Sequence, residues 1–185
     1  MPRLFVGLDL PETVKDRLLT LEGGVPGARW QDREQLHLTL RFIGEVEEPD
    51  MLELVNGLGT LEMAPFALQL SGAGQFGDKR PHVIWAGVEE NADLRRLAAK
   101  VEQVVQRKGF PPETRKYHPH VTLARLKNPT TERVFRYVAD HSLFRSETFD
   151  VSEFHLFESH LGSAGAIYQI VASFALNRSA PEEGH

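Results

Sequence analysis

A four-residue pattern of histidine, apolar residue, threonine and apolar residue occurs twice in this chain, at residues 37–40 and again at residues 120–123. Strict alternation of polar and apolar side chains predicts a half-buried β-strand. Side chains at positions i and i+2 of a strand point to the same face, so the histidine and threonine of each pattern share one face while the apolar residues face a core. Two strands of one chain therefore each present an imidazole beside a hydroxyl group.

The polar side chains of the two patterns, His37, Thr39, His120 and Thr122, form a candidate acid–base site. Histidine has an unperturbed pKa of about 6.5, so one imidazole can accept a proton while another donates one. Threonine hydroxyls can donate hydrogen bonds to phosphate oxygens. If the two strands face each other, the set suits general acid–base cleavage of a phosphodiester. The alternative interpretation is two buried edge histidines with hydrogen-bonded threonines.

The composition limits the classes of protein that this chain can belong to. Its 185 residues suffice for one domain, or for two small lobes that share a core. Hydrophobic residues make up 41% and charged residues 25%, as in ordinary globular proteins. The absence of cysteine excludes a disulfide framework, thiolate metal sites and a cysteine nucleophile.

Neither a membrane nor long duplex nucleic acid is an expected partner. No stretch approaches the ~18 uninterrupted apolar residues of a membrane span, and Asp9 follows Met1 too closely for a signal peptide. We therefore expect a cytoplasmic location. Proteins that grip a duplex by its phosphates usually carry a positive excess, whereas this chain has a net charge of −5. A small anion or the end of a nucleic acid needs only a local basic pocket and stays allowed.

Hydrophobic periodicity predicts the order strand, helix, strand, helix, strand, strand, and then helix, strand, helix, strand, strand. Short connections between neighbouring strands predict antiparallel pairing and hence an α+β fold. Each half of this order contains one histidine motif, so we expect two similar halves. Residues 71–81 are rich in glycine and include Lys79 and Arg80, which predicts a flexible, basic loop. Residues 179–185 are expected to form a loose tail.

The residue types favour a strained phosphate ester as the substrate. Arg125 lies just past the second motif, and the planar guanidinium of arginine suits a phosphate group. A five-membered 2′,3′-cyclic phosphate opens readily, whereas an unstrained diester is more often cleaved with metal ions. The His-x-His pair of His118 and His120 has no clear third metal ligand nearby. We therefore expect no metal and no cofactor, and we expect His118 at the rim of the site.

The chain resembles the two-histidine (2H) phosphoesterase superfamily, which is defined by paired His-x-Thr/Ser-x motifs. Within that superfamily it is most similar to the RNA 2′,3′-cyclic phosphodiesterase family, formerly called 2′-5′ RNA ligases. The resemblance covers nearly the whole chain, in residues 3–11, Trp30 with 36–46, 80–88, 109–111 with 119–125, 157–161 and Tyr168.

The resemblance implies one bilobal domain over residues 1–178, an α+β fold with two antiparallel sheets, flanking helices and a central cleft. It implies metal-independent hydrolysis of an RNA-terminal or nucleotide 2′,3′-cyclic phosphate to a 2′-phosphomonoester. RNA 3′ ends or cyclic nucleotides are the expected partners, and a monomer is expected. Each motif strand would line one side of the cleft.

The resemblance also implies roles for individual residues, by motif position. His37 would be the proton donor to the departing 3′-oxygen, and His120 the proton acceptor that activates water. Thr39 and Thr122, together with Arg125, would bind the phosphate. Phe42 would stack on the terminal base, a contact that tolerates any base. The assignment of donor and acceptor inverts if the sugar binds the other way round.

Strand geometry raises one difficulty for these roles. Phe42 and Arg125 each lie five positions past their motif histidine, and strict alternation puts such residues on the face opposite the imidazole. For either side chain to reach the site, its strand must end, twist or contain a bulge. Arg41 is the in-phase alternative on the first strand, unless it simply faces solvent.

Two other functions stay open. A non-catalytic module that binds nucleotides or RNA ends could use the same cleft, although binding alone does not need two titrating groups. RNA 2′-5′ end joining, the reverse reaction, could use the same acid and base. Because water at high concentration favours hydrolysis, we expect joining only as a side activity.

Overall fold

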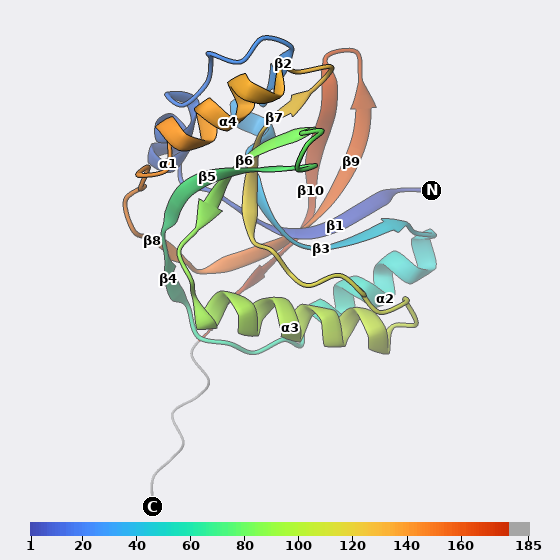
Figure 1. The fold of residues 1–185 in the computed structure, drawn as a ribbon. Coiled ribbons are helices and arrows are strands. Elements are labelled where there is room, and N and C mark those ends of the chain that lie inside the picture. Colours follow the sequence, from blue (N-terminus) through green and yellow to red (C-terminus); the bar gives the residue numbers. More distant parts are fainter. Residues whose placement is uncertain (178–185) are drawn as a thin grey trace, which may run out of the picture.

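The computed structural model describes residues 1–177, and over these residues the chain forms four α-helices and two four-stranded antiparallel sheets, with a small two-stranded sheet beside them (Figure 1). This arrangement confirms the predicted α+β class with two antiparallel sheets and flanking helices. The tail predicted at residues 179–185 lies outside the described residues. Within the described part, no helix has the length and apolar character needed to cross a membrane.

The predicted elements occur in the predicted order, and the structure adds three short strands, Ala28–Trp30, Leu70–Phe76 and Phe149–Val151, that periodicity did not separate from their surroundings. The strands are β1 (Arg3–Asp9), β2 (Ala28–Trp30), β3 (His37–Glu45), β4 (Phe66–Leu68), β5 (Leu70–Phe76), β6 (Val83–Val88), β7 (His120–Leu126), β8 (Phe149–Val151), β9 (Glu153–Gly162) and β10 (Gly165–Ala175). The helices are α1 (Glu12–Leu19), α2 (Glu48–Leu58), α3 (Ala92–Arg107) and α4 (Thr131–Asp140), and a 3-10 turn, η1 (Arg33–Gln35), precedes β3.

The two histidine motifs lie in different sheets. One sheet has the order β10-β9-β1-β3, and the other has the order β2-β7-β6-β5. Each motif therefore begins a strand, β3 or β7, and these two strands contact each other where the sheets meet. Helices α2 and α3 pack together at one end of the molecule (Figure 1). The sheets thus bring both motifs to a common boundary.

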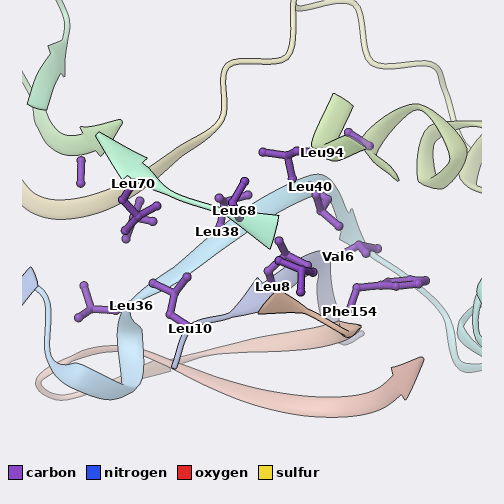
Figure 2. Packing of buried hydrophobic residues seen from close by; sticks show 14 of the residues in the cluster. Val6, Leu8, Leu10, Leu36, Leu38, Leu40, Leu68, Leu70, Leu94 and Phe154 are labelled. Carbon is purple, nitrogen blue, oxygen red and sulfur yellow. The ribbon is translucent and has the colours of Figure 1, made fainter. Parts of the chain in front are cut away.

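The apolar residues of the motifs face the core, as alternation predicts. Leu38 and Val121 are fully buried, and Leu40 and Leu123 are nearly so. Figure 2 shows Leu38 and Leu40 among the leucines of neighbouring strands. One hydrophobic cluster continues from these strands to the stripe on α3. Burial of the alternate apolar residues fixes which face of each motif strand is left for polar side chains.

The prediction of a flexible loop over residues 71–81 is wrong for most of its length. Residues up to Phe76 form β5, which pairs with β6, and only the segment after it is a loop. Gly74 lies under the indole of Trp85, where a Cβ atom would overlap the ring. A glycine there permits close packing, which local composition cannot distinguish from the flexibility of a loop.

Replacement of Gly74 by alanine tests this packing. We expect Gly74→Ala to lower the free energy of unfolding by about 1–3 kcal/mol, because the added methyl group overpacks the site against Trp85. Gly59→Ala is the matched control, since Gly59 has right-handed helical dihedrals and no contact closer than 3.4 Å for a Cβ atom. Urea denaturation of both variants measures the difference, and equal stabilities would contradict the packing argument.

Candidate active site

A cavity of about 180 Å³ lies between the two sheets, and all six side chains singled out from the sequence line it. They are His37, Thr39, Phe42, His120, Thr122 and Arg125. The remaining lining residues come from β1, the segment around η1 and the β9–β10 hairpin, and are Arg3, Leu4, Phe5, Gln31, Gln35, Ser159, Ala166 and Tyr168. The fold therefore brings both motifs to one small space.

A β-bulge brings Phe42 into phase with the first motif. On β1, Gly7 pairs with Thr39 and Phe5 pairs with Phe42, so β3 contains one residue more than β1 between these pairs. Residues 5 and 7 of β1 share a face, and their partners therefore share it too. The bulge thus places Phe42 on the same side of the sheet as Thr39. Phe42 is 56% exposed and is not part of the core.

A second bulge does the same for Arg125. On β6, Trp85 pairs with Thr122 and Val83 pairs with Arg125, and the register shifts by one residue between these pairs. Trp85 and Val83 share a face of β6, so Thr122 and Arg125 share a face of β7. The guanidinium thereby reaches the same cavity as the hydroxyl of Thr122. The two bulges remove the difficulty that strict alternation raised.

Each motif imidazole is oriented by a backbone carbonyl two residues earlier. The Nδ1 atom of His37 lies 2.8 Å from the carbonyl oxygen of Gln35, and that of His120 lies 2.7 Å from the carbonyl oxygen of His118. A carbonyl can only accept a hydrogen bond, so Nδ1 carries the hydrogen in both rings. The Nε2 atom is then the one available for proton transfer. In His37 it lies 3.0 Å from the hydroxyl of Thr39.

Aromatic rings surround His37. The ring of Phe5 lies 4.8 Å from the imidazole, and the edge of Tyr168 approaches at the same distance. Phe157 stacks on Phe5 at 4.9 Å and also lies 6.0 Å from the imidazole. His120 has a comparable wall, with Phe76 at 4.8 Å and Trp85 at 6.3 Å. Both imidazoles therefore have aromatic rings as close neighbours.

These surroundings make both imidazoles weaker bases. Burial is the largest cause and lowers the pKa of His37 to about 4, while the Gln35 carbonyl opposes this shift. The positive charges of His120 and Arg125 lower the pKa of His37 further. Burial also lowers the pKa of His120, with the His118 carbonyl opposing it and the charges of His118 and Arg125 adding to it. With no anion in the cavity, both rings are therefore neutral at neutral pH.

Sequence reasoning missed Gln35, which connects three parts of the site. Its backbone carbonyl orients His37, and its side-chain nitrogen donates to the carbonyl of Ala166 on β10 at 2.8 Å. Its side-chain oxygen accepts from the backbone N–H of Asp32 at 2.8 Å, which completes a capping box for η1. The Asp-x-x-Gln spacing was the one local signal of this role. Tyr168, which lines the same cavity, was also given no site role by the sequence analysis beyond the resemblance.

Arg41, the in-phase alternative on the first motif strand, neither lines this cavity nor faces solvent. Its guanidinium pairs with Glu102 of α3 and donates to the carbonyl of Pro111. The bulge explains this, because Arg41 pairs with the buried Val6 and so lies on the other face of the sheet. Arg41 thus joins β3 to α3 and to the loop that follows α3.

The donor set of the cavity suits an anion. It offers imidazole, hydroxyl and guanidinium groups and contains no carboxylate. Among residues 1–177, no group of three or more histidine, cysteine, aspartate or glutamate side chains is arranged to hold a metal ion. His118 lines the neighbouring, larger cavity together with His120, which agrees with its predicted place at the rim.

Known proteins share both the sequence and this architecture. Residues 16–163 match the 2′-5′ RNA ligase superfamily. A protein of Aeropyrum pernix described as an RNA 2′,3′-cyclic phosphodiesterase is 39% identical over 152 residues, which cover 79% of this chain and 84% of the relative. A Thermus thermophilus protein of the same description is 34% identical over 186 residues, covering 94% of this chain and 90% of the relative.

The fold comparison points to the same group. The crystal structure of Escherichia coli LigT complexed with 3′-AMP has a TM-score of 0.78 and 26% identity, and the match covers 96% of this chain and 100% of LigT. A Thermus thermophilus crystal structure matches with a TM-score of 0.76 and 31% identity, over 94% of this chain and 97% of the other. From its sequence and its fold, the chain belongs to the RNA 2′,3′-cyclic phosphodiesterase family of the 2′-5′ RNA ligase superfamily.

Proposed function

We propose that this protein hydrolyses a 2′,3′-cyclic phosphate, at the end of an RNA or on a nucleotide, to a 2′-phosphomonoester by general acid–base catalysis with two histidines. The observation that carries the proposal is the meeting of two imidazoles, each with Nε2 available, and the guanidinium of Arg125 in one cavity. The activity for which the relatives are named and the 3′-AMP bound to LigT support the same class of substrate.

The reaction needs one proton acceptor and one proton donor. The Nε2 atom of His120 takes a proton from water as the water oxygen attacks phosphorus. The bond between phosphorus and the 3′-oxygen breaks, and the Nε2–H of His37 gives its proton to that oxygen, leaving a 3′-hydroxyl and a 2′-phosphate. Thr39, Thr122 and Arg125 hold the non-bridging oxygens, on which negative charge accumulates. One further proton exchange with solvent restores both imidazoles.

Because the pKa of His37 is low, the proton donor forms only when an anionic substrate binds and favours the charged imidazole. In the free protein His37 is neutral, with the Thr39 hydroxyl as the hydrogen-bond donor to Nε2. A phosphate anion favours the charged imidazolium, and protonated Nε2 becomes a donor instead. The hydroxyl of Thr39 is then released from Nε2 and can donate to a phosphate oxygen. Binding of the anion and charging of His37 are thus coupled.

The proposed reaction does not depend on a metal ion. The five-membered cyclic ester is strained and carries a leaving group that one protonated imidazole can assist. In metal-dependent enzymes a metal ion stabilises the negative charge on the phosphate oxygens. Here Arg125 and the threonine hydroxyls stabilise that charge. The absence of carboxylates from the cavity lining supports this mechanism.

The first prediction concerns the two histidines. We expect His37→Ala and His120→Ala each to lower kcat on 2′,3′-cyclic AMP by at least about 10²-fold, the usual contribution of an acid–base group. His160→Ala is the matched control, because His160 lies on β9 outside the cavity lining and should leave kcat unchanged. A wild-type protein that binds a nucleoside monophosphate without any turnover would instead indicate a binding module.

The second prediction concerns the metal and the product. Turnover of 2′,3′-cyclic AMP should be the same with and without excess EDTA, and phosphorus NMR should show the 2′-monophosphate as the product. Loss of activity in EDTA that returns with added divalent cation would overturn the metal-independent mechanism. A 3′-monophosphate product would show that the 2′-oxygen is the leaving group, and the roles of His37 and His120 as proton donor and acceptor would then be reversed.

The third prediction concerns pH. In an NMR titration of the free protein, the imidazole of His37 should titrate at about pH 4, and it should titrate at higher pH once inorganic phosphate is bound. Since kcat/KM reports the ionisation of the free enzyme, it should decrease as pH rises through neutrality, because the charged fraction of His37 falls. A His37 titration that saturating phosphate does not move would contradict the proposed coupling.

A further inference from the structure

Gln31 is a buried glutamine whose side chain has no partner in the protein. Its exposed fraction is 8%, and within residues 1–177 its carboxamide forms no hydrogen bond with another residue. Buried polar groups are nearly always hydrogen-bonded, because a bond to water that is lost and not replaced costs free energy. Gln31 lines the cavity of about 180 Å³, and the proposed reaction gives it no part.

The carboxamide of Gln31 is buried but can still be reached. The Oε1 atom of Gln75 is sealed off from solvent and has no partner, whereas neither amide atom of Gln31 is sealed in this way. Because Gln31 borders the cavity, a molecule bound there can contact its amide. The residue thus offers polar atoms to a ligand and uses none of them to hold the fold.

Strand pairing directs Gln31 towards Arg125. Trp30 of β2 packs against the hydrophobic core, so the residues on either side of it, Arg29 and Gln31, point to the opposite face. Arg29 pairs directly with Arg125 of β7, and directly paired residues share a face. The backbone N–H of Gln31 donates to the carbonyl of Leu123 at 2.8 Å and extends this ladder by one residue. Gln31 therefore lies on the wall of the cavity that carries Arg125.

The backbone around Gln31 is fixed on both sides. Gln31 itself is bonded to β7, and the N–H of the next residue, Asp32, donates to the side-chain oxygen of Gln35 at 2.8 Å. The side-chain nitrogen of Gln35 is in turn bonded to Ala166 of β10. The amide of Gln31 thus starts from a position that is set before a ligand arrives. A donor of this kind costs little reorganisation when charge develops beside it.

A bound phosphate has room for a further donor on this wall. Thr39 and Thr122 each offer one O–H group, and Arg125 offers a fork of parallel N–H groups. The two non-bridging oxygens of a cyclic phosphate have more lone pairs than these donors occupy. A carboxamide supplies N–H groups without a charge, so it can stand beside a guanidinium without the repulsion that a second cation would bring.

We propose that Gln31 is a further substrate-binding residue, whose Nε2–H group donates to a non-bridging phosphate oxygen on the side of Arg125. This inference rests on the proposed function, since it uses the same bound phosphate. A phosphate oxygen only accepts hydrogen bonds, so the nitrogen end of the amide turns to the ligand. The charge on that oxygen increases as water attacks phosphorus, and the hydrogen bond is therefore stronger in the transition state than in the bound substrate.

The proposal makes a prediction about stability that a structural role does not share. The amide of Gln31 gives the folded protein no internal hydrogen bond, and its burial costs free energy. An apolar side chain of similar shape should therefore be tolerated without loss of stability. If Gln31 served only to hold the fold, its replacement would weaken the fold.

Gln31→Met tests both parts of the argument, because methionine keeps the unbranched shape and removes the amide. We expect kcat/KM on 2′,3′-cyclic AMP to fall about 10- to 100-fold, the usual effect of losing a hydrogen bond to a charged group. The Kd of inorganic phosphate, measured by NMR titration, should rise about tenfold or more. The midpoint of urea denaturation should be equal to that of the wild-type protein or higher.

Gln31→Glu adds a charge at the same place. It keeps the shape of the side chain but replaces the donor by an anion beside the phosphate. Both kcat/KM and the affinity for inorganic phosphate should therefore fall further than in Gln31→Met. Phosphate affinities equal to the wild-type value in both variants would mean that Gln31 does not contact the anion.

Gln75→Met is the matched control, since Gln75 also has an unpartnered amide oxygen but lines neither of the two cavities. It should leave kcat/KM and the Kd of phosphate unchanged. A lower urea midpoint in Gln31→Met with unchanged phosphate affinity would overturn the inference and leave the proposed hydrolysis intact. A wild-type protein that binds phosphate but does not turn over 2′,3′-cyclic AMP would overturn the proposed function, and the phosphate titrations would still decide whether Gln31 contacts the anion.

Discussion

The hydrogen bond from each motif imidazole to the backbone carbonyl two residues earlier determines what the site can do. Without it, a histidine at the start of a strand could rotate and present either nitrogen. With it, His37 and His120 each hold Nδ1–H against a carbonyl and leave Nε2 for the reaction. The same hydrogen bond occurs once in each sheet, and the two imidazoles become a pair because β3 and β7 contact each other.

Desolvation and charge then set the state of that pair. The aromatic rings around His37 make its charged form costly in the empty site, and Arg125 and His120 add to that cost. A bound anion opposes the effects of burial, Arg125 and His120 on the pKa of His37, because its negative charge stabilises the imidazolium. In the proposed mechanism the cavity therefore favours phosphate in two ways: it provides donors to the oxygens, and His37 becomes charged mainly when the oxygens are present.

Local periodicity was sufficient to predict the motif strands and their buried faces, whereas the meeting of both histidines at one site was expected from the family resemblance. Periodicity could not predict that Phe42 and Arg125 lie beside the histidines. Each of these residues reaches the cavity because of a bulge, and a bulge is visible only in the pairing of β3 with β1 or of β7 with β6. The same holds for Gly74, whose use depends on Trp85, and for Gln35, which is 131 residues from its partner Ala166. Contacts between distant segments carry this information, and alternation within a segment does not.

Two contacts that join β3 to the α3 side of the cleft bear on the access of water to the site. Arg41 with Glu102, and Tyr117 with the Thr39 carbonyl, hold the walls of the cleft at a set separation. Closure of the cleft at this point would break both contacts. With these contacts in place the mouth is open to solvent, so in the proposed reaction bulk water can reach phosphorus. End joining requires that water is kept out, whereas hydrolysis consumes it, so a cleft held open to water favours the proposed ring opening over the reverse reaction.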